Sequence, residues 1–364
     1  MMLIFNILVY TMIFTVFNME SRKVQRVGYS TFSVSLPKEW VKETGIKQGD
    51  LVMFLPEKGG SLRLMPSTMI EQKKEAEEYV INSDLCDEPD MLERLIVGNY
   101  TLGRDIFRIV SSTRISSAHG EEIRKIIHRL TGLSIVEETP NQIVLQCSID
   151  QTKFRIDTLM RRLSVIASTM HSEAVQALVE LDEELAEDAI RRENEADMMY
   201  WLAIRLLLSA QRDHTVAEKI GLEDPRQIIY YGLIMRHLES IADYAENIAR
   251  RAIEFKKFRK NGVSKRVIRQ IENLSGLVQN IFLKAMDCFF NSDIGIANNV
   301  LEISKVVEKE HERLMKEPPE IPILRIVVWG LARIADNGAG IAVIAINRAL
   351  EKPSKVCSFH SFQS

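Results

Sequence analysis

Two pairs of acidic residues at helical spacing are the groups in this chain best suited to chemistry. Glu193 and Asp197 lie four positions apart in RRENEADMMY, and Glu239 and Asp243 repeat that spacing in RHLESIADYAENI. Residues four apart share one helix face, where two like charges cost roughly 0.2–0.5 kcal/mol. Carboxylate oxygens are the ligands that hard cations prefer, so a bound metal would offset that cost. Solvent and basic neighbours are the simpler alternative.

The second acidic segment has a partial copy further along the chain. Residues 236–248 and 329–341 share the pattern Leu-x-x-Ile-Ala-Asp with a downstream Ile. On a helix this pattern gives one apolar face, with the acidic positions on the strip beside it. A repeated segment of this kind favours an internal duplication.

The copy predicts a second cation site that is weaker than the first. Ala332 stands where Glu239 stands in the first segment, so Asp336 is the acid that remains there. The preceding segment VEKEHERL adds Glu308 and Glu312. The full set of expected metal ligands is Glu193, Asp197, Glu239, Asp243, Glu308, Glu312 and Asp336. Such an oxygen-rich set suits a divalent metal or iron and does not decide between them.

The elements that must position these acids are long helices. From about residue 154 to 351, apolar residues recur at heptad-like spacing, with Gly, Pro and Asn breaking the pattern four times. We therefore predict six long helices, arranged as two three-helix bundles over residues 151–260 and 261–352. Facing helices of a bundle are a place where carboxylate metal sites are built.

Short strands are predicted ahead of the helices, in residues 20–66. Four β-like runs surround a short helix that opens at Pro37 and stops at Gly45. Basic residues gather on the first strand and at the start of this helix, namely Arg22, Lys23, Arg26 and Lys38. They could neutralise DNA phosphates or simply form a solvated basic surface. A module this small exposes much apolar surface, so an intertwined dimer is expected.

A small α/β connector is predicted over residues 67–150. Its first part, up to about residue 98, is charged and helical in pattern. Residues 105–149 follow a strand–helix–strand–strand order, in which the helix is expected to stop at Gly132. The connector carries no chemical motif.

Composition limits the class of protein. The chain has 364 residues, of which 46% are hydrophobic and 27% charged, as in a globular protein of two or three domains. A net charge of −3 excludes a general polyanion binder, so any nucleic-acid site is local. Four scattered cysteines argue against a zinc site or a disulfide framework and fit a reducing compartment. The sequence contains no GxSxG, Walker A, GxGxxG or HExxH motif, so we expect no enzyme.

Two segments allow more than one interpretation. Residues 1–18 form an uncharged apolar run close to the length that spans a bilayer. We interpret it as a start-site artefact ahead of Met19, and the alternative is a membrane anchor followed by basic residues. Residues 250–269 hold nine basic residues and one acid. They could bind nucleic acid, anionic lipid or an acidic partner, or they could be a solvated connection between the bundles.

Residues 154–351 resemble the PhoU family of phosphate-uptake regulators. The family carries E/D-x-x-x-D motifs and the signature R-x-L-E-R-I-x-D-H-A-x-N-I-A, which RHLESIADYAENIAR matches apart from substitutions such as Ser240 and Tyr244. RRENEADMMY is similar to the family's other acidic motif. The resemblance implies that the acidic motifs bind metal clusters. The residues that inherit this role are Glu193, Asp197, Glu239, Asp243 and, in the degraded copy, Asp336.

Residues 22–66 resemble the AbrB/SpoVT swapped-hairpin DNA-binding domain. The match rests on RKVQRVG, SVSLPKEW and GIKQGD, and Tyr29 replaces the Arg that usually follows the strand-end Gly. The resemblance implies a dimer that binds duplex DNA.

Together these observations predict an α+β protein with a swapped-hairpin β-barrel module, a small α/β connector and C-terminal all-α tandem three-helix bundles. The predicted function is a metal-binding and DNA-binding regulator of phosphate uptake, acting as a cytoplasmic homodimer with DNA as partner and no small-molecule substrate. The alternative is an adaptor that docks on a phosphate ABC transporter ATPase or sensor, with the N-terminal module only dimerising. A carboxylate-bridged metalloenzyme would need a substrate pocket and open coordination positions, and the sequence indicates neither.

Overall fold

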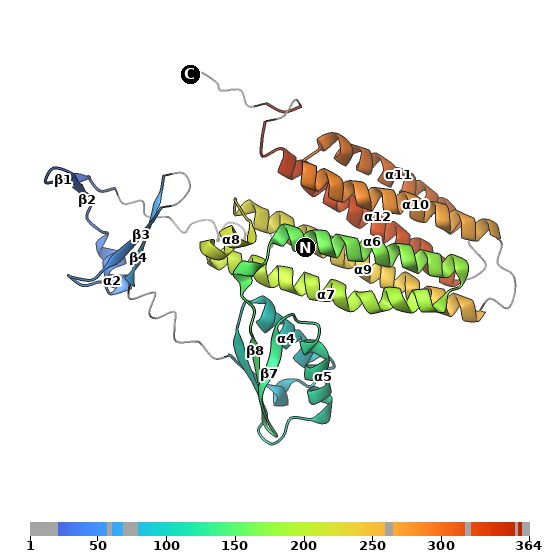
Figure 1. Cartoon of the computed structure of the whole chain (residues 1–364), viewed down its shortest axis with the longest axis horizontal. Coiled ribbons are helices and arrows are strands. Elements are labelled where there is room, and N and C mark those ends of the chain that lie inside the picture. Colours follow the sequence, from blue (N-terminus) through green and yellow to red (C-terminus); the bar gives the residue numbers. More distant parts are fainter. Residues whose placement is uncertain are drawn as a thin grey trace, which may run out of the picture. The chain divides into compact units, whose positions relative to one another are not determined.

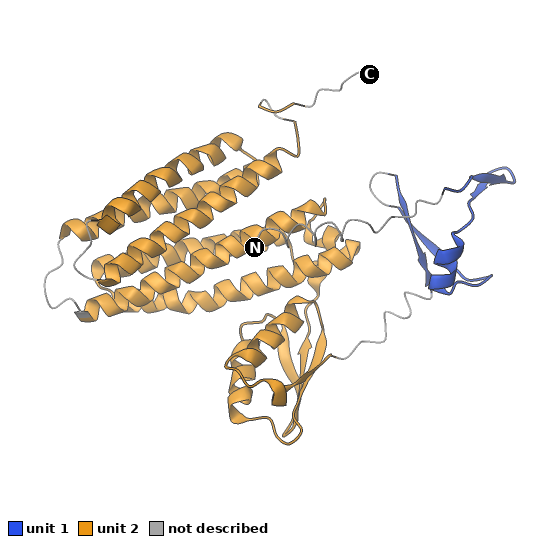
Figure 2. Ribbon diagram, turned by 180° about the vertical axis from the view of Figure 1, so that it is seen from behind, with its two compact units in different colours: residues 1–77 blue, residues 78–364 orange. Residues whose placement is uncertain are grey.

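The chain forms two compact units, residues 1–77 and 78–364 (Figure 2). The computed structural model describes residues 21–56, 60–67, 79–258, 265–316, 322–353 and 356–358. The apolar run at residues 1–18 lies outside the described residues, so its interpretation stays a prediction.

The described part of the N-terminal unit contains two β-hairpins and one short helix. Strand β1 (Gln25–Val27) pairs antiparallel with β2 (Thr31–Ser33), and β3 (Val52–Pro56) pairs antiparallel with β4 (Leu62–Pro66). Helix α2 (Lys38–Thr44) connects the hairpins and ends at Gly45, whose φ of 68° is a left-handed conformation that glycine adopts without strain. The predicted strands and helix of this unit are confirmed.

The second unit begins with a small α/β subdomain, residues 79–147. Its sheet has the strand order β5 (Tyr79–Asn82), β6 (Ile106–Val110), β8 (Gln142–Cys147), β7 (Leu133–Thr139). Strands β5 and β6 are parallel, and the other pairs are antiparallel. Helix α4 (Met91–Thr101) connects the parallel strands and contacts α5 (Ser117–Ile127). Short 3-10 turns lie at Ser83–Leu85 and Gln151–Lys153.

Two local predictions for this segment are wrong. Tyr79 and Val80 were expected in a helix but begin β5, because pairing with β6 overrides the local charged pattern. The helix expected to stop at Gly132 ends at Ile127 instead. The amides of Arg129 and Leu130 bond back to carbonyls three residues earlier, which makes a tight turn before β7.

In the described residues, six long helices make up most of the rest of the second unit (Figure 1). They are α6 (Ile156–Glu180), α7 (Glu183–Arg212), α9 (Arg226–Phe258), α10 (Lys265–Asn291), α11 (Ile294–Lys316) and α12 (Pro322–Ala349), with the short α8 (His214–Ile220) after α7. Helices α6, α7 and α9 pack together, as do α10, α11 and α12. The predicted mixed α+β fold with a helical C-terminal region is confirmed.

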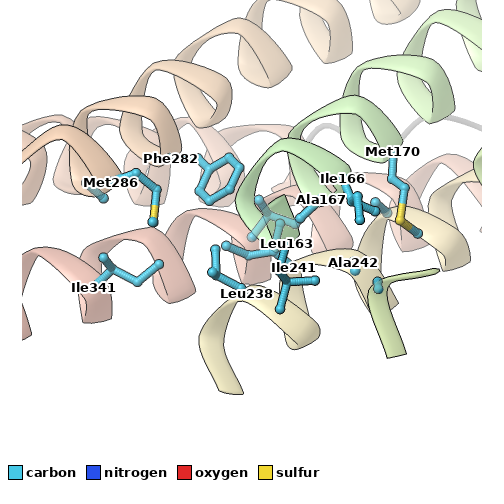
Figure 3. Packing of buried hydrophobic residues seen from close by; sticks show 14 of the residues in the cluster. Leu163, Ile166, Ala167, Met170, Leu238, Ile241, Ala242, Phe282, Met286 and Ile341 are labelled. Carbon is cyan, nitrogen blue, oxygen red and sulfur yellow. The ribbon is translucent and has the colours of Figure 1, made fainter. Parts of the chain in front are cut away.

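One apolar core runs through both groups of helices. Figure 3 shows Leu163 and Ile166 of α6 meeting Leu238 and Ile241 of α9, with Phe282 of α10 beside them. Burial of the apolar stripe of α9 fixes the rotation of that helix. The acidic strip next to the stripe therefore faces the margin of the core.

The two copies of the repeated segment pack against each other, one on α9 and one on α12. The Nδ1 of His237 lies 2.8 Å from the Oδ1 of Asn337, and a Cβ added at Gly340 would lie 2.6 Å from the His237 ring. At the other end, a Cβ on Gly330 would lie 3.2 Å from Ile248. Early residues of each copy thus meet late residues of the other, so the helices cross antiparallel with an approximate twofold relation.

Helix α12 is long and apolar enough by composition to span a membrane, and it is the one described helix of that kind. It packs against α9, α10 and α11, and its apolar residues belong to the common core. Its apolar character is therefore accounted for by burial between helices.

Candidate carboxylate site

The four acids predicted for the first bundle lie along the contact between α7 and α9. Asp197 and Glu239 are only 5% and 8% exposed, Glu193 is partly buried, and Asp243 is exposed at the margin. Charge on Asp243 acts on Glu193, and charge on Glu193 acts on Glu239. The packing of these two helices therefore brings the two predicted pairs into one acidic site.

Arg129 from the α/β subdomain supplies positive charge to this site. One of its terminal nitrogens lies 3.2 Å from Glu193 and also forms an ion pair with Asp197. The other lies 3.3 Å from Glu93, on α4. A single guanidinium thus joins carboxylates from two elements that are far apart in the sequence.

Two further arginines pair with acids on α9 itself. Arg236 contacts Glu239 at 2.7 Å, and Arg250 contacts Glu246 at 2.6 Å. Both arginines are largely exposed, so these are solvent-screened pairs of modest strength. Within the described chain, Asp243 has neither a hydrogen bond nor an ion pair.

Burial and mutual repulsion make these carboxylates poor anions. Burial raises the pKa of Glu193 despite Arg129, and the charges of Glu246 and Asp243 raise it further. Burial likewise raises the pKa of Glu239, with Arg236 opposing. Asp243 reaches solvent, but the protein atoms around it remove part of its hydration, and this desolvation together with the charge of Glu239 raises its pKa to about 6. Each acid would be stabilised by an added cation.

The chemistry of this site fits a hard cation, but the donor atoms are not gathered around one point. Among the described residues, no group of three or more His, Cys, Asp or Glu side chains is placed to hold a metal ion. The Oδ2 atom of Asp197 is buried and accepts no hydrogen bond, although Arg129 lies against it. The guanidinium of Arg129 thus already supplies positive charge at this oxygen.

The acids predicted for the second bundle are arranged differently. Glu308 and Glu312 are exposed on α11, and Asp336 is exposed on α12. Glu312 pairs with Lys316 at 3.7 Å, and Asp336 pairs with Arg333 at 2.8 Å. No hydrogen bond or ion pair joins the three acids to one another within the described part of the chain. The second site remains a prediction from the repeat.

Sequence reasoning missed the contribution of the α/β subdomain. Arg129 and Glu93 were assigned no role, because neither lies in a motif. A cavity of about 600 Å³ opens beside Arg129 and Glu193. Its lining residues are Lys125, His128, Arg129, Ile190, Glu193, Asn194, Glu246 and Arg250. The sequence around Arg129 is rich in Arg and Lys, which indicates a basic surface there. This composition does not identify which basic residue reaches the acids.

The basic residues predicted to meet DNA are accessible in the N-terminal unit. Arg22, Lys23 and Arg26 are exposed at and before β1, and Lys38 is exposed at the start of α2. Arg26 also donates to the carbonyl of Tyr29, which holds the β1–β2 turn. The second basic segment, 250–269, lies partly outside the described residues. Of its described arginines, Arg250 and Arg251 pair with acids on α9.

Three histidines of the described helices have structural surroundings. His171 is buried, its Nδ1 lies against Oε1 of Gln279 at 2.5 Å, and its Nε2 lies 3.1 Å from Oγ of Ser275. Burial lowers its pKa to about 4. His237 bonds across the bundles as described above, and His311 is partly buried on α11.

The fold and the acid-lined helices define a tandem helical-bundle protein with an N-terminal hairpin domain. Residues 160–252 match the family description "PhoU domain". Residues 25–72 match "Antidote-toxin recognition MazE, bacterial antitoxin". The chain therefore carries a region that matches the PhoU domain and an N-terminal region that matches the MazE antitoxin domain.

Relatives with the same helical region are known. A "Phosphate-specific transport system accessory protein PhoU homolog" from Pseudomonas aeruginosa is 26% identical over 48% of this chain and 74% of its own length. The homologue from Pseudomonas putida is 27% identical over 48% and 70%. The crystal structure of PhoU from Pseudomonas aeruginosa superimposes with a TM-score of 0.47 at 22% identity, covering 54% of this chain and 96% of that chain. PhoU from Streptococcus pneumoniae gives 0.46 at 17% identity, covering 54% and 94%.

Proposed function

We propose that this protein is a cytoplasmic, DNA-binding regulator of phosphate uptake that acts as a homodimer and is not an enzyme. The observation that carries the proposal is the combination in one chain of a PhoU domain with an AbrB-like domain. The relatives of the helical region are named for phosphate-specific transport. The second domain adds a means of acting at a promoter.

The surface of the N-terminal unit supports the dimer. Its strands bury almost nothing, and Phe32, Phe54 and Leu51 are 69%, 63% and 74% exposed. Two isolated two-stranded hairpins are marginal in water, so they need a covering partner. A second copy of the same unit supplies an equally apolar surface, which would bury these side chains.

The cation proposal rests on the first bundle. We assign Glu193, Asp197, Glu239 and Asp243 as the groups that would hold a divalent metal or iron, because they lie along one contact between two helices and the pKa values of Glu193, Glu239 and Asp243 are raised. Such an ion would supply charge compensation rather than a reaction. Glu308, Glu312 and Asp336 would form the weaker second site.

Salt-dependent DNA binding tests the regulator. The full-length protein should bind duplex DNA from its own phosphate-transport promoter, with affinity falling steeply as salt rises because neutralised phosphates release counterions. Replacing Arg22, Lys23 and Arg26 with Ala should flatten the salt slope by about one unit for each lost contact. Arg191→Ala, an exposed arginine on α7, is the matched control.

The runner-up is an adaptor that docks on the transporter's ATPase or on a sensor. It is favoured by the word "accessory" in the names of the relatives. If the variant with Ala at Arg22, Lys23 and Arg26 keeps the wild-type DNA affinity and salt slope, the proposal of a DNA-binding regulator is wrong. Co-purification with a phosphate transporter would then support the adaptor.

A further inference from the structure

The four-stranded sheet of the α/β subdomain has one face that its own helices cover. Helices α4 and α5 lie on this face (Figure 1), and side chains from both helices share a core with Phe107, Ile109 and Leu145 of the strands. The residues that alternate with these along the strands point to the opposite side of the sheet. We call that side the open face.

The open face is apolar at positions where a sheet that meets water is usually polar. Its apolar residues, which come from all four strands, are Val80, Ile106, Val110, Val136 and Val144. Val80, Ile106 and Val136 are 55%, 41% and 53% exposed. Among the described residues, none of the five belongs to the core beneath α4 and α5. A group of exposed apolar side chains on one surface indicates that another surface covers it.

Two opposite charges lie on either side of the centre of the open face. Arg108 on β6 is paired with Val144 on β8, and Val144 is paired with Glu137 on β7. Residues that are directly opposite in neighbouring strands point to the same face, so the three form one row across the sheet. Arg108 and Glu137 each lie one strand spacing, about 4.8 Å, from the central valine.

This row is complementary to itself when a second copy is turned over and laid on it. A twofold axis that runs along β8 in the plane between two sheets carries β6 of one copy over β7 of the other. Arg108 then lies opposite Glu137 of the partner subunit, twice in the dimer, and Val144 lies opposite the partner's Val144. Sheets that pack face to face are about 10 Å apart, a gap that an arginine and a glutamate can bridge together.

The N-terminal unit favours a second copy of this chain as the occupant of the open face. Residues 68–78 connect β4 to β5, and 11 residues span at most about 36–40 Å. A dimer of the N-terminal units therefore holds two subdomains at an effective concentration on the order of millimolar. A face of four short strands makes a small contact, which suffices once the two chains are already joined.

We propose that the open face is a second dimer contact, in which the α/β subdomains of two copies pack sheet to sheet and form two ion pairs between Arg108 and Glu137. The proposal rests on the dimer proposed above for the N-terminal unit. The subdomain is fastened to α7 by Arg129 and by the fully buried Arg205. The contact therefore fixes the placement of the two helical regions in the dimer.

Charge reversal in the full-length protein tests the contact. Arg108→Glu and Glu137→Arg each place like charges opposite one another, so each should raise the dissociation constant of the dimer at least about tenfold in a dilution series. The double variant should restore the wild-type value. Arg124→Glu is the matched control, because Arg124 lies on α5 and pairs with Glu138 on the covered side. It should leave the dissociation constant unchanged. An unchanged value for either single variant would overturn the proposal.

Co-expression of the two single variants separates a contact between subunits from an effect within one chain. A dimer of one Arg108→Glu chain with one Glu137→Arg chain regains both ion pairs, whereas each unmixed dimer has none. The mixed dimer should therefore form in clear excess over the unmixed dimers. A random distribution would show that the charges act within their own chains and would overturn the contact.

Thiol labelling separates this contact from the dimer on which it rests. In a Cys357→Ser background the remaining native cysteines are buried, so Val136→Cys introduces the one accessible thiol among the described residues. This thiol should react more slowly in the dimer than when Phe54→Asp is added to make a monomer. Equal rates in a dimeric protein would overturn the sheet contact alone. A monomeric wild type would overturn the N-terminal dimer and this contact with it.

Discussion

At the scale of single residues, the acidic site is held in an unfavourable state that its neighbours only partly relieve. Asp197 is buried against the guanidinium of Arg129, Glu239 pairs with the exposed Arg236 and accepts from Ser240, and Asp243 makes no hydrogen bond or ion pair in the described chain. Raised pKa values follow from burial first and from like charges second. Such sites cost folding stability, and a protein retains them where an ion or a switch uses them.

The pKa of Asp243 leads to a prediction about stability and pH. Its pKa is about 6 in the folded protein against 3.8 for a free side chain, so the folded state binds more protons between those values. Stability should therefore fall as pH rises from about 4 to 6. With chelator present, Asp243→Asn should stabilise the protein at pH 7.5 by about 1 kcal/mol, a value reduced for solvent screening at this exposed group.

Thermal melts at several pH values measure this effect. The gain of Asp243→Asn should disappear below about pH 3, where the wild-type carboxyl is also neutral in both states. Asp336→Asn is the matched control, because Asp336 is exposed, pairs with Arg333 and holds the equivalent position in the repeat. A similar gain in stability for both variants would show that the raised pKa of Asp243 does not cause the effect.

At the scale of elements, the crossing of α9 and α12 holds the two bundles together. His237 fits over Gly340, and Ile248 fits over Gly330, so the closest approach requires the absence of a side chain on α12. Small residues at a helix crossing allow the backbones to approach and constrain the choice of partner face. The repeat thus serves packing as well as acid placement.

Two glycine substitutions test the crossing. Gly340→Ala should destabilise the protein by about 1–3 kcal/mol, because its Cβ would meet the His237 ring. Gly276→Ala, on α10, meets no atom within 4 Å and should stabilise by up to about 1 kcal/mol through helix propensity. Urea denaturation of both variants measures the difference. Equal effects would mean that the α9–α12 contact tolerates a methyl group.

At the scale of the whole molecule, the two units differ in how far each can stand alone. The second unit has a continuous core through its helices and a separate core in its α/β subdomain. In the described part of the N-terminal unit, most apolar side chains are exposed and almost all of the others are only half-buried. We therefore expect dimerisation of the protein to depend on the N-terminal unit.

The dimer can be tested by placing a charge on the exposed surface of the N-terminal unit. Phe54→Asp should shift the protein from dimer to monomer in sedimentation velocity, because a buried unpaired carboxylate at the contact would cost several kcal/mol. Val165→Asp is the control, since Val165 on α6 has a similar exposure of 64%. It should leave the dimer intact. A monomeric wild type would contradict the proposed assembly.

The sequence by itself determined the features that repeat at short range. The spacing of Glu193 with Asp197 and of Glu239 with Asp243 placed each pair on one helix face, and the apolar stripe of α9 fixed the side on which that face lies. Six helices, the hairpins and the α5 to β8 order followed from the same local periodicities. β5 did not, since a strand of four residues is chosen by its partner β6.

Only the tertiary structure decided what meets the acids. Arg129 lies 64 residues from Glu193 in the sequence, in a turn without a motif, and reaches it because the α/β subdomain docks on α7. Packing also decided how the two predicted acidic sites differ. The acids of the second bundle are exposed, and Glu312 and Asp336 each pair with a basic residue on their own helix. Local periodicity fixes which side of a helix a residue occupies. Which charge faces that side depends on contacts between distant segments, and these arise only when the whole core assembles.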